Sequence, residues 1–114
     1  MQGDNIVTKQ QEQILEQFQA YQQQAQNVLA QRNAFSLELR DINNALDELK
    51  KTEEEKVYKI SGPLLIKSNK EEVMKELEER RDIIELRLKT LERQEAKIKE
   101  KLEELKEKIK GMGL

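Results

Sequence analysis

Apolar residues recur at every seventh position along two long stretches of this 114-residue chain, and a second series interleaves with each. This spacing places both series on a single stripe of a helix, which is the pattern of a coiled coil. The sequence therefore predicts one helix over residues 1–52, another over 69–110 and a short tail at 111–114. The first stripe is Val7, Gln11, Ile14, Phe18, Tyr21, Ala25, Val28, Arg32, Phe35, Leu39, Ile42, Leu46 and Leu49, and the second is Met74, Leu77, Arg81, Ile84, Leu88, Leu91, Glu95, Ile98, Leu102, Leu105, Ile109 and Met112.

The start of each predicted helix carries residues that can cap it. Asp4 or Asn5 can accept hydrogen bonds from the free N–H groups of a first helical turn, so we expect the first helix to begin near them. The second helix has two candidate capping boxes, and the sequence leaves both open. They are Ser68 with Glu71 and Asn69 with Glu72.

Helical spacing lapses over residues 53–68, a charged linker followed by two short apolar runs on either side of Ser61-Gly62-Pro63. Pro63 lacks an N–H and does not fit a helix interior, whereas Gly62 can adopt a positive φ, so we expect a β-hairpin that reverses over residues 60–63. Three consecutive apolar residues in its second run make both faces of that strand apolar. A two-stranded hairpin is only marginally stable in water, so we expect it to complete its sheet with other subunits. The predicted assembly residues are Val57, Tyr58, Ile60, Gly62, Leu64, Leu65 and Ile66.

Two long helices joined by a short hairpin must run antiparallel. The predicted fold is therefore a single, all-α dominated domain, a long antiparallel two-helix coiled coil with one central β-hairpin. With the reversal near Ser61 and Gly62, Leu49 is expected near Met74 and Ile14 near Ile109. Both chain ends would then meet at one tip, far from the hairpin. Arg32 and Glu95 interrupt the apolar stripes within about one turn of each other. They form either a cross-helix ion pair that fixes the register or two separate charges that extend to water.

Composition narrows the possible functions. The chain has no His and no Cys, which removes thiol chemistry and the usual zinc ligands, and we expect neither an enzyme, nor a cofactor, nor a metal site. Basic and acidic residues are mixed, with a net charge of −2, so we expect no nucleic-acid partner. No apolar run approaches the ~20 residues of a membrane span, and no signal peptide is evident, so we expect a cytoplasmic protein.

Long arms on both sides of Val57-Tyr58-Lys59, Gly62 and Leu64-Leu65-Ile66 resemble the β-class subunit of archaeal prefoldin. The resemblance covers nearly the whole chain, including residues 18–25 and 91–95. It implies an ATP-independent chaperone built from two α-class and four β-class subunits, whose hairpins form an intersubunit double β-barrel. It also implies that the tips of the arms hold unfolded polypeptides and deliver them to a group II chaperonin.

A chaperone of this kind needs exposed apolar surface, and the tip supplies candidates from both helices. Most of them also belong to the stripes, so ordinary coiled-coil packing is the alternative for each. Leu15 and Ile6 lie outside the stripes. The predicted client-binding residues are Ile6, Val7, Ile14, Leu15, Phe18, Leu105, Ile109, Met112 and Leu114.

Two further interpretations remain open at this stage. The first helix is rich in glutamine between Gln10 and Gln31, which makes either a solvated face or an adaptable surface for extended chains, because an amide both donates and accepts hydrogen bonds. The alternative to a chaperone is a structural coiled-coil adaptor or scaffold without chaperone activity.

Overall fold

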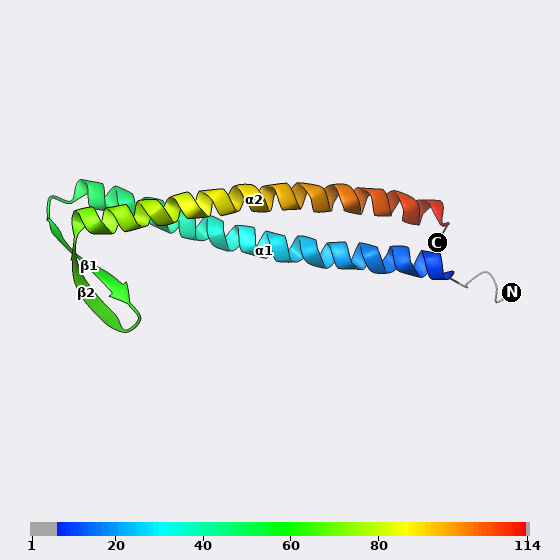
Figure 1. The fold of residues 1–114 in the computed structure, drawn as a ribbon, viewed down its shortest axis with the longest axis horizontal. Coiled ribbons are helices and arrows are strands. Elements are labelled where there is room, and N and C mark those ends of the chain that lie inside the picture. The colour runs from blue at the N-terminus through cyan, green and yellow to red at the C-terminus, as the bar shows by residue number, and fades with distance from the viewer. Residues whose placement is uncertain (1–6, 114) are drawn as a thin grey trace. The chain divides into compact units, whose positions relative to one another are not determined.

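A computed structural model describes residues 7–113 of the chain (Figure 1). Over these residues the elements follow in the order α1 (Lys9–Lys51), β1 (Lys56–Ser61), β2 (Leu64–Asn69) and α2 (Lys70–Gly111). They form two compact units. The hairpin unit is Asn33–Lys89, and the terminal unit is the described chain before residue 33 and after residue 89. Four residues of the sequence-based predictions lie outside the described residues, namely Asp4, Asn5, Ile6 and Leu114.

Helix α1 begins at Lys9, later than the sequence predicted, because Thr8 and Gln11 form a capping box. The Gln11 N–H donates to Thr8 Oγ1 at 3.1 Å, and the Thr8 N–H donates to Gln11 Oε1 at 2.9 Å. These two bonds satisfy N–H groups that a helix start leaves without partners.

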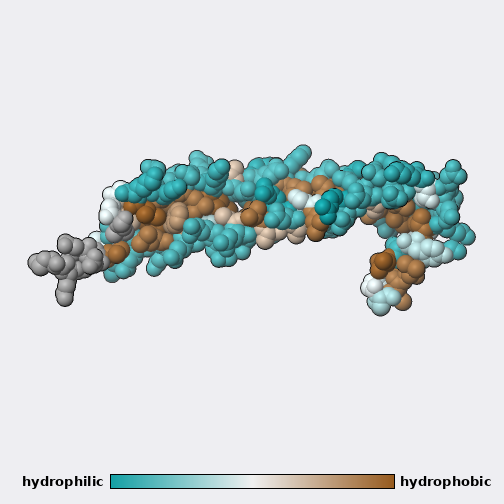
Figure 2. All heavy atoms as spheres, turned by 180° about the vertical axis from the view of Figure 1, so that it is seen from behind, coloured by the Kyte–Doolittle hydropathy of each residue, from teal (hydrophilic) through white to brown (hydrophobic). Residues whose placement is uncertain are grey.

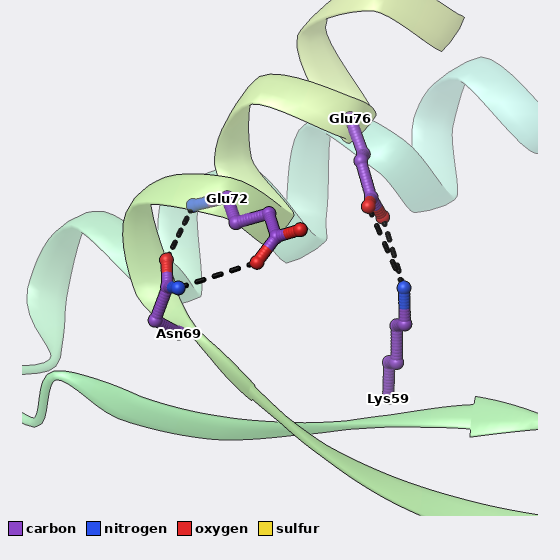
Figure 3. Close-up of polar contacts among 4 residues, drawn as sticks. All are labelled: Lys59, Asn69, Glu72 and Glu76. Atoms are coloured by element: carbon purple, nitrogen blue, oxygen red, sulfur yellow. Dashed lines mark hydrogen bonds and ion pairs between the residues drawn. The ribbon is translucent and has the colours of Figure 1, made fainter.

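Of the two caps considered for α2, the structure contains Asn69 with Glu72 (Figure 3). The Glu72 N–H donates to Asn69 Oδ1 at 2.8 Å, and Asn69 Nδ2 donates to Glu72 Oε2 at 3.2 Å. The cap therefore uses the residue immediately before the first helical residue, Lys70.

In the hairpin unit, α1 and α2 pack through the predicted stripes. Ile42, Leu46 and Ile84 form a buried cluster, and Ile84 is completely inaccessible to solvent. Burying a side chain of this size stabilises the folded state by about 1.5–3 kcal/mol. The partly buried residues packed against this cluster are Phe35, Leu39, Met74, Leu77 and Leu88.

The terminal unit uses the same stripes, and its buried residues are Val28, Leu91, Ile98 and Leu105. Every buried hydrophobic residue within 7–113 is a stripe residue, so the predicted antiparallel two-helix coiled coil is confirmed.

Ion pairs join the helices beside these apolar contacts. In the hairpin unit, Arg80 Nε and Nη2 donate to the two carboxylate oxygens of Glu38, both at 3.0 Å, and this hydrogen bonding raises the pKa of Arg80 above its usual value. In the terminal unit, Arg32 Nε lies 3.3 Å from Glu95 Oε2, which confirms the predicted cross-helix contact. That Glu95 oxygen is buried and has no hydrogen-bond partner among the described residues, so the contact is electrostatic and poorly aligned.

Candidate assembly hairpin and client-binding tip

The hairpin is held by an antiparallel ladder that pairs Ser61 with Leu64 and Ile60 with Leu65. The reversal therefore spans Ser61–Leu64, one residue later than the sequence predicted. Gly62 has a φ of 58° and is followed by Pro63, the pattern of a type II′ turn, whose twist matches that of paired strands. The missing N–H of Pro63 costs nothing there, because a central turn residue makes no ladder bond.

The hairpin exposes most of its apolar side chains (Figure 2). Ile60 on β1 is 81% exposed and Leu65 on β2 is 67% exposed. Tyr58, Leu64 and Ile66 are also exposed, and Val57 is half-buried. Among the described residues this sheet has two strands, so both also present an unpaired backbone edge. Contiguous apolar surface with open edges on a small element is typical of an interface.

Contacts from α2 fix the base of the hairpin and the linker that precedes it. The Lys70 N–H donates to the Glu55 carbonyl at 2.7 Å, and Lys70 Nζ donates to the Thr52 carbonyl, also at 2.7 Å. Further out, Lys59 Nζ on β1 lies 3.4 Å from Glu76 Oε2 on α2 (Figure 3). These bonds connect the hairpin to the end of α1 and the start of α2.

Sequence reasoning missed Lys70, although a signal was present. A cation at the first residue of a helix opposes the helix dipole, which favours acidic residues there. The antiparallel arrangement resolves the conflict, because the side chain reaches the carbonyl just beyond the end of α1, where a cation is favoured.

The ends of α1 and α2 in the terminal unit enclose a groove of about 580 Å³, which we call the tip groove. It brings together two predicted client-binding residues from opposite ends of the chain, Ile14 and Met112. Its lining is completed by Thr8, Gln10, Gln11, Lys108 and Gly111.

The other predicted tip residues within 7–113 do not line this groove, and they differ in exposure. Val7, Leu15, Phe18 and Ile109 are partly exposed, whereas Leu105 is 1% exposed. Leu105 is thus a packing residue in this conformation, and it becomes accessible only if the helix ends separate. Leu15 is half-buried although it lies outside the stripes.

A second groove in the terminal unit was not foreseen from the sequence. It has a volume of about 580 Å³, and we call it the arm groove. Its lining is Tyr21, Gln24, Asn27, Val28, Gln94, Lys97, Ile98 and Lys101. A signal was present in the glutamine-rich stretch of α1, because one of its two interpretations was an adaptable surface for extended chains.

The two helices bury their apolar stripes against each other, and the hairpin between them exposes apolar side chains. This arrangement is typical of a coiled-coil protein that works as a subunit of a larger assembly. A family model for the prefoldin subunit matches residues 12–113. The chain belongs to the prefoldin subunit family, whose members are chaperone subunits. No helix within residues 7–113 is both long and apolar enough to cross a membrane.

Individual relatives support the same assignment. The prefoldin subunit beta of Archaeoglobus fulgidus is 43% identical over 100 residues, which cover 87% of this chain and 86% of that protein. The prefoldin subunit beta of Thermococcus onnurineus is 45% identical over 97 residues, 84% of each chain. The resemblance to the β class of archaeal prefoldin is therefore confirmed.

Solved structures agree with the fold. The crystal structure of the prefoldin beta subunit from Thermococcus strain KS-1 is similar with a TM-score of 0.81 and 39% identity, over 94% of this chain and 95% of that one. The beta2 subunit of the same strain has a TM-score of 0.71 at 20% identity, over 79% of this chain and 97% of that one, which supports the fold alone.

Proposed function

We propose that this chain is a subunit of an ATP-independent holdase that binds unfolded polypeptides at the tip of its coiled coil. The observation that carries the proposal is the tip groove, where Ile14 and Met112 offer apolar surface that the seam leaves partly uncovered. Apolar side chains of an unfolded polypeptide can cover that surface without ATP or any other cofactor. The subunit then passes its client to a group II chaperonin in the cytoplasm, and it performs no enzymatic step.

The hairpin is the proposed interface through which this chain joins other subunits. The exposed strands carry Tyr58, Ile60, Leu64 and Leu65, and pairing with neighbouring hairpins would cover both these side chains and the strand edges. In the proposed hexamer, four β-class copies join two α-class subunits through a double β-barrel. The coiled coils then project from this platform with their tips free.

Weak contacts are sufficient in such an assembly. Several tips that hold one client act together, because the first contact raises the effective concentration of the others. Opening of the last helical turns has a low free-energy cost and would add Leu105 and Ile109 to the contact surface.

A comparison of two double variants tests the tip assignment. Ile14→Ser with Met112→Ser removes apolar surface from the tip groove. Leu29→Ser with Leu37→Ser is the control, because it removes two leucines that are 43% and 52% exposed elsewhere on α1. Light scattering of chemically denatured, unrelated proteins measures the suppression of aggregation. Circular dichroism and sedimentation verify that both variants remain helical and assembled.

We expect the tip variant to lose suppression and the control to keep it. Deletion of roughly the first dozen and last few residues should have the same effect while the oligomer stays intact. Equal protection by the tip variant and the wild type would contradict the tip assignment. If the wild-type chain fails to slow aggregation of any unrelated protein, the scaffold alternative replaces the holdase.

A further inference from the structure

The arm groove combines an apolar floor with a cationic rim. Val28 and Ile98 are buried stripe residues that form the floor, and the ring of Tyr21 lies partly exposed beside them. Lys97 and Lys101, one turn apart on α2, stand at the rim. None of the eight lining residues is acidic. The groove therefore suits a ligand that pairs an apolar group with negative charge.

The basic rim belongs to a longer row. Arg93, Lys97 and Lys101 are spaced four residues apart, which places them on the same side of α2. Lys101 forms an exposed ion pair with Glu104 at 3.3 Å, whereas Arg93 and Lys97 have no ion pair among residues 7–113. Like charges at this spacing destabilise a helix slightly, and a bound carboxylate would relieve that repulsion.

The facing helix does nothing to neutralise this row. Residues 17–31 of α1 contain no charged side chain, and Gln24 and Asn27 line the groove from that helix. An amide both donates and accepts hydrogen bonds, so these side chains can bind the backbone of an extended peptide in either direction. No carboxylate within residues 17–31 of α1 competes for this row, so apart from the Lys101–Glu104 pair its positive charge remains available to a ligand.

We propose that the arm groove is a second polypeptide-binding site, selective for extended segments in which an apolar side chain is flanked by Asp or Glu. The apolar side chain enters between Tyr21 and the floor, the neighbouring carboxylates contact Lys97 and Lys101, and the amides bind the backbone. The inference rests on the proposed function and deepens it, because the tip would supply general apolar affinity and the arm groove a preference for acidic segments.

Dye-labelled peptides test this selectivity by fluorescence anisotropy with the full-length chain. One peptide has a phenylalanine flanked by aspartates, and its matched partner has the same phenylalanine flanked by lysines. The charge variant is Lys97→Glu with Lys101→Glu. Its control is Lys89→Glu with Lys106→Glu, which makes the same change at exposed positions of α2 outside the groove.

We expect the wild type and the control to bind the aspartate peptide more tightly than the lysine peptide, and the charge variant to reverse this order. Two exposed contacts that turn from attractive to repulsive should weaken aspartate-peptide binding about tenfold. A steric pair adds a second measurement. Gln24→Trp should weaken binding of the aspartate peptide, because the larger side chain occupies the groove. Gln22→Trp lies outside the groove lining and should leave the binding unchanged.

Any one of three results would overturn the inference. These are equal binding of the two peptides by the wild type, no detectable binding of either peptide, and unchanged selectivity in the charge variant. Tighter binding of a single-stranded oligonucleotide than of the aspartate peptide would also overturn it. The aggregation assay separates the two proposals. If the wild type suppresses aggregation but shows no peptide selectivity, the arm groove fails and the holdase stands. If it suppresses no aggregation, the holdase itself fails.

Discussion

Removing the two partners of the Arg32–Glu95 pair one at a time should destabilise the coiled coil unequally. Arg32→Ala leaves behind the carboxylate of Glu95, whose Oε2 atom is buried and already lacks a hydrogen bond. Glu95→Ala leaves behind a long side chain whose guanidinium can extend to water. The structure thus predicts that Arg32→Ala is the more damaging change.

The magnitudes follow from the exposure of the pair. Each side chain is 36% exposed, so the attraction across 3.3 Å is strongly screened and a coupling free energy of roughly 0.5–1 kcal/mol is expected. Leaving the Glu95 carboxylate without a partner should cost about 1–3 kcal/mol, and Glu95→Ala should cost about 1 kcal/mol or less. The double variant removes the orphaned carboxylate. It should therefore be no less stable than Arg32→Ala alone.

Urea unfolding followed by circular dichroism measures all four proteins of this double-mutant cycle. Urea carries no charge and leaves the ion pair unscreened, and added salt should reduce the coupling. The protein concentration must be held constant, because the stability of an oligomer depends on it. If the double variant loses the sum of the two single losses, the residues do not interact and the proposed role of the pair in register is refuted.

Three other changes test the hairpin. Leu65→Lys should dissociate the oligomer without loss of helicity, because Leu65 is exposed in the isolated chain, and an unchanged sedimentation profile would exclude assembly through this strand. Lys70→Met should lower the free energy of unfolding by about 1 kcal/mol through loss of the bond to the Thr52 carbonyl, and Lys75→Met, exposed on the same helix, should have no effect in the same urea titration. Gly62→Ala should cost about 1–2 kcal/mol from its φ of 58° alone, since nothing lies within 4 Å of an added Cβ, and an unchanged thermal midpoint would contradict the turn assignment.

Much of the fold could be predicted from the sequence because its determinants are local. The heptad spacing identified every buried hydrophobic side chain within residues 7–113, from Val28 to Leu105, since one helical period decides which side faces the partner helix. Gly62 and Pro63 located the hairpin because Gly62 permits a positive φ and Pro63 excludes a helix interior. The turn was displaced by one residue because strand pairing, which depends on both strands together, sets its final position.

The features that were missed depend on residues distant in sequence. The bond from Lys70 to Thr52 requires the start of one helix to meet the end of the other. The arm groove likewise depends on how side chains of both helices leave space between them, which no single stretch encodes. The start of α1 is the exception, because it was missed although the reciprocal capping pair of Thr8 and Gln11 is local.

The different exposure of the hairpin and the tip suggests different roles for their apolar residues. Ile60, 81% exposed, would remain available for association until another chain covers it, so the hairpin suits a permanent interface. The tip leaves Ile14 and Met112 partly exposed but covers Leu105, so under the proposed function a client gains further apolar contact there as the helix ends open. A substitution that tightens the last turns should therefore weaken client binding while it raises stability. Under the proposed function, the opening equilibrium of the tip would adjust the affinity for clients without any change to the proposed hairpin interface.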